Sequence, residues 1–192
     1  MRITSGIIGG RTVDAPRQGA RPTQDKVRAA LFSSLGDYPV GARVLDLFAG
    51  SGALGLEAWS RGAAQVCWVE SGKAVFPILK KNVETLCRGG GEVQCIQADV
   101  FRYLAKPGVG PFDLALADPP YDREGTYNWL NQLLDALKDH GVVKMGGFFI
   151  FEQSAGEKFV EKPGWILVKE KKYGDTRLLF YRRMEKEAEV LS

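Results

Sequence analysis

The sequence predicts an α/β protein built on a doubly wound, mostly parallel sheet. Apolar runs of strand length alternate with helical stretches, and such alternation is typical of parallel sheets that carry helices on both faces. Near the end of the chain two runs alternate with period two around a tight turn, which predicts an antiparallel hairpin. The strand candidates are 43–48, 65–69, 92–97, 112–117, 146–152, 165–172 and 176–183, and the helix candidates are 53–60, 73–87, 100–105 and 124–138.

Length and composition are those of one globular domain. The chain has 192 residues, of which 45% are hydrophobic and 26% charged, and it contains no apolar run long enough to cross a membrane. The three cysteines show no metal-type spacing, so we expect reduced thiols, no metal site and a cytoplasmic protein. We divide the chain into an N-terminal extension (1–40), a main domain (41–184) and a charged tail (185–192).

A glycine-rich turn between the first strand and the next helix predicts a cofactor pocket. Gly50 and Gly52 allow the backbone to bend sharply and approach a ligand, and the helix that follows directs its free N–H groups into the same gap. Gly55 would let this helix pack closely on its strand. The expected pocket residues in this stretch are Asp46, Phe48, Ala49, Gly50, Ser51, Gly52 and Gly55.

Two cofactors fit this turn. Gly50, Gly52 and Gly55 spell G-x-G-x-x-G, and Glu70 at the end of the next strand could bind the hydroxyls of a ribose, as in nicotinamide dinucleotides. S-adenosylmethionine places its ribose in the same position but carries an ammonium group, which Asp46 could face. Asp99 and the Val100 backbone could meet an adenine edge, although Asp99 could equally cap the next helix.

The Asp118-Pro119-Pro120-Tyr121 segment directly follows the fourth strand and favours the second cofactor. Two prolines give a rigid bend with free carbonyls. The Asp118 side chain and the Pro119 carbonyl could accept the two N–H groups of an exocyclic amine, which would turn the nitrogen lone pair toward a sulfonium methyl group. Tyr121 offers a flat face for stacking the base. The segment thus predicts methylation of a nucleobase amine.

The first 28 residues carry a net charge of +4. A helix is predicted to open at Pro22-Thr23 and to end before Gly36, so the last of these residues form its first turns. Such a basic arm on a near-neutral body suits a phosphate-rich partner. The expected RNA phosphate contacts are Arg2, Arg11, Arg17, Arg21 and Arg28.

Together these motifs resemble a known family. The stretch 46–55 and the segment 118–121 look like S-adenosylmethionine-dependent amino-methyltransferases, and the segments 7–10, 21–32 and 173–176 narrow the resemblance to the bacterial ribosomal RNA small-subunit methyltransferase D family. This resemblance implies a Rossmann-like class I methyltransferase with a small N-terminal β-ribbon and helix extension. It also implies methylation of N2 of one guanine in 16S ribosomal RNA (the guanine-966 type), and a position for Thr23 and Arg28 near the methionine end of the cofactor.

Two other functions stay open. An adenine-N6 methyltransferase acting on DNA or RNA would use the same Asp-Pro-Pro-Tyr segment. A nicotinamide-dependent oxidoreductase would use the same glycine turn, but it has no need of that segment or of a basic arm. We expect 16S ribosomal RNA as the partner, either alone or within an assembling small subunit.

Overall fold

The computed structural model describes residues 1–16, 22–88, 91–120 and 127–185, with side chains in the first helix described from Asp25 onward. Within these ranges no helix is long and apolar enough to span a membrane. The expected contributions of Arg17, Arg21, Tyr121 and the Thr23 side chain lie outside the described part of the structure.

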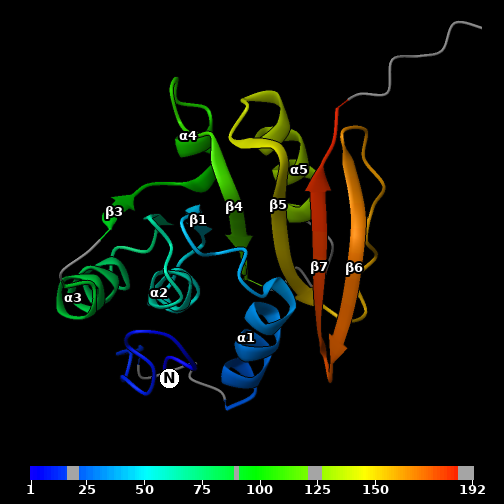
Figure 1. The fold of residues 1–192 in the computed structure, drawn as a ribbon. Coiled ribbons are helices and arrows are strands. Elements are labelled where there is room, and N and C mark those ends of the chain that lie inside the picture. The colour runs from blue at the N-terminus through cyan, green and yellow to red at the C-terminus, as the bar shows by residue number, and fades with distance from the viewer. Residues whose placement is uncertain (17–21, 89–90, 121–126, 186–192) are drawn as a thin grey trace, which may run out of the picture.

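A seven-stranded sheet with the order β3-β2-β1-β4-β5-β7-β6 forms the centre of the molecule (Figure 1). The pairs among β1 to β5 are parallel, and β7 pairs antiparallel with both β5 and β6. This confirms the predicted parallel sheet with a terminal hairpin. The strands are β1 (Arg43–Leu47), β2 (Gln65–Glu70), β3 (Glu92–Gln97), β4 (Phe112–Ala117), β5 (Val143–Ser154), β6 (Trp165–Tyr173) and β7 (Thr176–Arg183).

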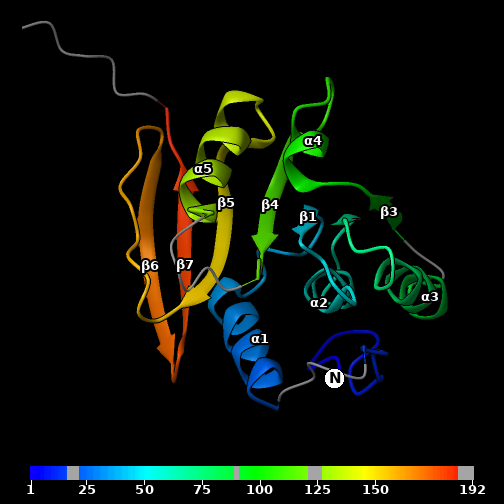
Figure 2. The same ribbon diagram turned by 180° about the vertical axis from the view of Figure 1, so that it is seen from behind.

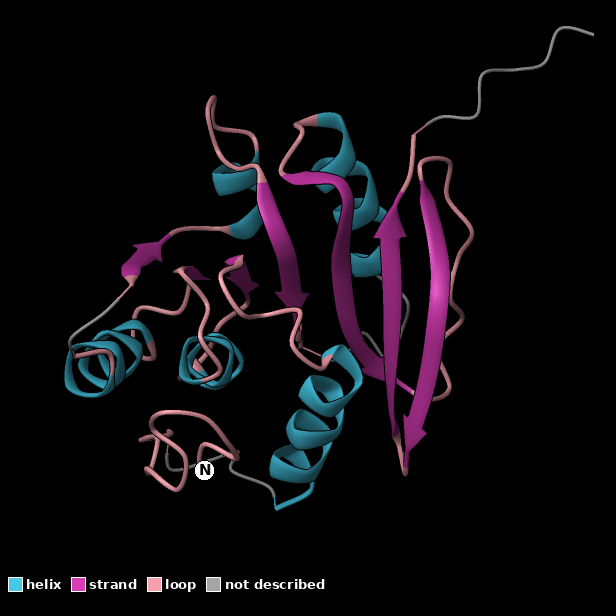
Figure 3. Cartoon of the chain, in the orientation of Figure 1, coloured by secondary structure: helices cyan, strands magenta, loops and turns pink. Residues whose placement is uncertain are grey.

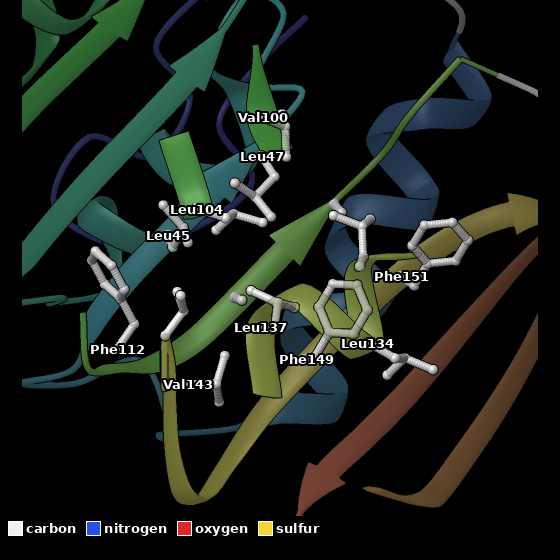
Figure 4. Close-up of a cluster of buried hydrophobic side chains, with 14 of the residues drawn as sticks. Leu45, Leu47, Val100, Leu104, Phe112, Leu134, Leu137, Val143, Phe149 and Phe151 are labelled. Atoms are coloured by element: carbon white, nitrogen blue, oxygen red, sulfur yellow. The ribbon is translucent and has the colours of Figure 1, made fainter. Parts of the chain in front are cut away.

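Helices cover both faces of the sheet, as Figures 2 and 3 show from two sides. On one face lie the N-terminal segment and three helices; on the other lie the remaining two, over the core shown in Figure 4. Alternate residues of each strand contribute side chains to the two cores, because successive side chains point to opposite faces of the sheet. The helices are α1 (Pro22–Leu35), α2 (Ala53–Ser60), α3 (Phe76–Leu86), α4 (Val100–Leu104) and α5 (Trp129–Asp139).

Some boundaries differ from those predicted. α5 begins at Trp129, whereas the apolar pattern had predicted a start at 124, and α3 begins at Phe76 next to Pro77, which suits a first helical turn. β5 starts earlier than predicted, at Val143, because a bulge relative to β4 accommodates Gly146 and Gly147 within one strand. Helix and strand ends are the least certain part of any pattern, so these shifts leave the architecture unchanged.

The N-terminal segment 1–16 packs against α2 and α3. Its only described ladder contact is a bridge between Arg2 and Thr12, so it is an irregular ribbon. Ile3 and Val13 are buried in the core under α1 and α2. The side chain of Asn82 on α3 bonds to both the N–H and the C=O of Asp14. The segment is therefore fastened to the main domain at both ends.

Candidate functional site

A cavity of about 250 Å³ opens at the carboxyl edge of the parallel strands. In Figure 1 the arrowheads of β4 and β5 point toward α1, which borders this edge. Ligands of open α/β sheets bind at such an edge. The lining residues are Met1, Ala15, Pro16, Arg28, Asp46, Phe48, Ala49, Gly50, Ser51, Ala53, Leu54, Asp118 and Glu152.

The glycine turn forms one wall, and its geometry explains its sequence. Gly50 and Gly52 have φ values of 55° and 87°, and Phe48 between strand and turn also has a positive φ of 55°. A Cβ at Gly55 would lie 2.2 Å from Nε1 of Trp68, so only glycine lets α2 approach β2 this closely. The Ser51 carbonyl accepts a hydrogen bond from Asn82, which ties the turn to α3. The turn is therefore held rigidly around the cavity.

Asp46 faces the cavity with one oxygen satisfied and one unsatisfied. Its side chain is only 1% exposed; Oδ2 accepts the Gly55 N–H at 2.8 Å, whereas Oδ1 has no hydrogen-bond partner. Burial, and then the nearby carboxylates of Asp118 and Glu70, raise the pKa of Asp46 well above its ordinary value. An unpaired carboxylate oxygen of this kind fits a cationic ligand group such as an ammonium.

Glu70 lies at the end of β2, next to the turn. Its two oxygens accept the backbone N–H groups of Gly50, at 2.7 Å, and Gly72, at 2.6 Å. Each carboxylate oxygen has two acceptor positions, so these bonds leave Glu70 able to accept hydroxyl donors as well. Its immediate role is to fix the glycine turn.

At the end of β3, Asp99 caps α4 by accepting the Arg102 N–H at 3.0 Å. This confirms the capping role that the sequence left open beside an adenine contact. The Val100 side chain is buried in the core under α4, so only its backbone could meet a ligand.

Asp118 and Pro119 follow β4 directly and border the same cavity. Asp118 is partly buried, no hydrogen bond joins its carboxylate to another described residue, and burial raises its pKa to about 6. Pro119 is buried and Pro120 is exposed, so the bend leaves the sheet toward the surface. Tyr121 begins a stretch outside the described residues.

Sequence reasoning missed Glu152. It lies on β5, is 9% exposed and lines the cavity, and no described residue bonds to its carboxylate. Burial, and then the Asp118 carboxylate, raise its pKa to about 8, against the opposing effect of Arg28. The signal was available: like Asp118, Glu152 is an acid at the carboxyl end of an apolar strand run.

The expected contact between Arg28 and an RNA phosphate is wrong. The Arg28 side chain is 3% exposed and is paired with Glu57 at 3.4 Å and with Asp25 at 3.0 Å. Its guanidinium also donates to the Arg2 carbonyl. Arg28 therefore fastens the N-terminal segment and supplies a buried positive charge beside the cavity. Arg2 and Arg11 are exposed and stay candidates for phosphate contacts.

Comparison with known proteins gives consistent matches over almost the whole chain. The family model described as "Conserved hypothetical protein 95" matches residues 1–182. Ribosomal RNA small subunit methyltransferase D of Escherichia coli (strain K12) is 36% identical over 95% of this chain and 90% of its own length. The protein of the same name from Haemophilus influenzae is 33% identical over 95% and 93%.

A solved structure agrees with these matches. The Escherichia coli structure called "Putative methyltransferase yhhF" superposes with a TM-score of 0.84 and 35% identity, covering 96% of this chain and 98% of that one. The sheet order with its terminal hairpin is that of a Rossmann-like class I methyltransferase, as predicted. The chain belongs to the family described as conserved hypothetical protein 95, which it shares with the ribosomal RNA small subunit methyltransferase D proteins.

Proposed function

We propose that this protein is an S-adenosylmethionine-dependent methyltransferase that modifies the exocyclic N2 amine of a guanine in 16S ribosomal RNA, of the guanine-966 type. The coarser part, methylation of ribosomal RNA, rests on family membership and on the names of its relatives. The observation that carries the proposal is the cavity itself, which is lined by Asp46, with Oδ1 unpaired, and by Asp118 and Glu152, whose carboxylates accept no hydrogen bond from the described residues.

The residues around the glycine turn fit the cofactor. S-adenosylmethionine supplies a methyl group on a positively charged sulfur. Asp46 would bind its ammonium group through the unpaired Oδ1, and Glu70 would accept its ribose hydroxyls beside the turn. The Gly50–Gly52 bend permits close approach of the backbone, and Asp99 with the Val100 backbone would border the adenine.

The residues after β4 fit the amine. Asp118 and the Pro119 carbonyl would each accept one N–H, which directs the nitrogen lone pair toward the methyl group. A nitrogen that gains a methyl group becomes positively charged and acidic, so a carboxylate beside it is a sufficient proton acceptor. Tyr121 would stack on the base, which must be splayed out of the RNA before its amine can reach the cavity.

The same cavity argues against a nicotinamide dinucleotide. Its pyrophosphate is anionic, and the cavity lining includes the acids Asp46, Asp118 and Glu152, whereas Arg28 is already paired with Glu57 and Asp25. Like charges brought together in a desolvated site repel each other strongly. We therefore favour a cationic cofactor over the oxidoreductase alternative.

Two measurements test the proposal. Mass spectrometry of 16S ribosomal RNA from cells that lack the protein should show one missing methyl group on guanine N2. Incubation of the purified protein with labelled S-adenosylmethionine and the unmethylated RNA, alone or in small-subunit particles, should restore N2-methylguanosine. N6-methyladenosine as the product would establish the adenine alternative instead.

A further inference from the structure

We propose that Glu152 is a second residue that contacts the target base: its carboxylate accepts the N1–H next to the amine held by Asp118, and it thereby selects guanine over adenine. This inference rests on the function proposed above. It assigns a substrate-recognition role to a residue at the end of β5, on the strand next to the one that precedes Asp118.

Strand register places the two carboxylates side by side. β4 and β5 are parallel neighbours in which Ala117 pairs with Phe151, so Asp118 and Glu152 occupy the next position on each strand. Adjacent strands lie about 4.8 Å apart. The two side chains are therefore close enough to contact neighbouring atoms of one base.

Both side chains also point to the same face. Ala117 and Phe151 belong to the core under α4 and α5, whereas Leu116 and Ile150 belong to the core on the α1–α2 face. Because side chains alternate along a strand, the residues at 118 and 152 point back to the α1–α2 face, where both line the cavity.

Neither carboxylate has a hydrogen-bond partner among the residues that the structure describes. No described residue donates a hydrogen bond to Asp118 or Glu152, although Glu152 is only 9% exposed. The charged groups that face Glu152 are the Asp118 carboxylate, which disfavours its ionisation, and the Arg28 guanidinium, which favours it. Both carboxylates line the cavity, so their oxygens are free to accept hydrogen bonds from a ligand that enters it.

Guanine supplies donors in the required arrangement. Its N1–H and its N2 amine lie next to each other on one edge of the ring. Adenine presents a bare N1, an acceptor, beside its N6 amine. The ionised form of Glu152, which the Arg28 guanidinium and a hydrogen bond from the guanine N1–H both favour, would accept a hydrogen bond from guanine and would repel the lone pair of adenine. Sites built to hydrogen-bond a donor reject analogues that lack it far more strongly than apolar pockets reject size changes.

The test compares two bases in two proteins. Synthetic RNA would carry guanine or 2-aminopurine at the target position, within small-subunit particles; 2-aminopurine keeps the N2 amine but has an acceptor at N1. At a pH above the raised pKa of Glu152, where its carboxylate is ionised, the wild-type protein should methylate guanine faster by a factor of about 100 or more. In Glu152→Gln, whose amide can either accept or donate, this ratio should fall by a factor of about 10 or more.

Binding provides a readout that does not depend on turnover. With S-adenosylhomocysteine present, the fluorescence of 2-aminopurine in the RNA reports base capture, and capture should strengthen in Glu152→Gln. Affinity for S-adenosylhomocysteine should stay within a few-fold. Glu161→Gln, which replaces an exposed acid outside the cavity, is the matched control and should behave like the wild type in every assay.

The outcomes separate the two proposals. If the wild-type protein methylates guanine but treats 2-aminopurine equally well, the role of Glu152 is overturned without any variant. An unchanged ratio in Glu152→Gln would overturn it as well. If the wild-type protein methylates no guanine at all, the proposed function fails and this inference fails with it.

Discussion

Two groups of buried or partly buried acids on the α1–α2 side of the sheet have opposite surroundings. Glu57 on α2 is completely buried, and its carboxylate accepts bonds from the Thr4 N–H at 2.8 Å, the Thr4 hydroxyl at 2.5 Å, Arg61 at 2.9 Å and Arg28 at 3.4 Å. Asp118 and Glu152 receive no such donors from the described residues, and Asp46 has one oxygen unpaired.

The difference separates structure from function. A buried carboxylate surrounded by donors stabilises the fold, since removing it leaves several charged or polar groups unpaired. A buried carboxylate without donors carries a desolvation cost that the native state bears. Such a cost is expected where a ligand supplies the missing partners, so the unpaired group marks the site.

The largest expected effect is the loss of stability when Glu57, the acid surrounded by donors, is replaced. Glu57→Ala should lower the free energy of unfolding by about 3–5 kcal/mol, because it leaves Arg28 and Arg61 without their shared carboxylate. Denaturant unfolding measures this. Glu84→Ala, which removes an exposed pair with Lys80, is the control and should cost at most about 1 kcal/mol. If both variants lost the same free energy of unfolding, the structural role of the buried Glu57 carboxylate would be contradicted.

In the unpaired group, Asp118→Ala should affect turnover and not the fold. Loss of an acceptor aimed at the reacting amine should reduce methyl transfer by about 100- to 1000-fold. Affinity for S-adenosylmethionine should stay within a few-fold, because Asp46 and the glycine turn bind the cofactor. Labelled methyl transfer and calorimetry measure the two quantities. If the variant no longer binds the cofactor, Asp118 contacts the cofactor and not the amine, and this assignment is wrong.

The pH dependence of turnover should follow the acceptor. Burial raises the pKa of Asp118 to about 6, so acidification below this value protonates the group that accepts the amine N–H. In Glu152→Gln, which removes the neighbouring titrating carboxyl group, the value of kcat/KM should therefore fall by about tenfold for each pH unit below that point. A profile that stays flat from pH 7 down to pH 5 would contradict this assignment.

Replacing Glu152 should stabilise the empty protein. Because the folded-state pKa of Glu152 is raised from 4.5 to about 8, the folded protein keeps this proton while the unfolded chain releases it. Wild-type stability is therefore lost as pH rises through this window. Glu152→Gln should unfold with a free energy on the order of 1–2 kcal/mol higher at pH 8, and the gain should vanish below pH 4.5. A loss at pH 8 would contradict it.

The smallest expected effect is on RNA affinity, when an arginine of the exposed N-terminal segment is replaced. Arg11→Ala should weaken RNA binding at low salt and reduce the slope of log affinity against log salt by about one unit, as expected for one phosphate contact. Binding measured across a range of salt concentrations tests this. An unchanged slope would exclude Arg11 from the RNA interface.

Local patterns predicted the sheet and most of the cavity. The alternation of apolar runs and helices predicted the parallel strands. Asp46 lies near the end of β1 and Asp118 follows β4, and both reach one edge because parallel strands share that edge. The capping role of Asp99 also follows from its place before a short helix. These features depend on neighbours in sequence.

Features that depend on distant partners were not predictable in the same way. Arg28 looks like a surface cation in sequence, and only the packing of α1 on α2 shows that Glu57 binds it. The start of α5 at Trp129 is not marked by a capping side-chain hydrogen bond at Asn128 in the structure. Glu152 was missed because no recognised motif surrounds it, and only the pairing of β5 with β4 places its carboxylate beside Asp118.

A structure of the protein with S-adenosylmethionine or its demethylated product and a guanine nucleoside would test the central claim most directly. We expect the cofactor ammonium on Asp46 Oδ1 and the guanine N2 within about 3 Å of the Asp118 carboxylate, in hydrogen-bond contact. The amine should lie about 3–3.5 Å from the methyl carbon. A cofactor whose sulfur lies far from Asp118, or a base bound outside the cavity, would contradict the account.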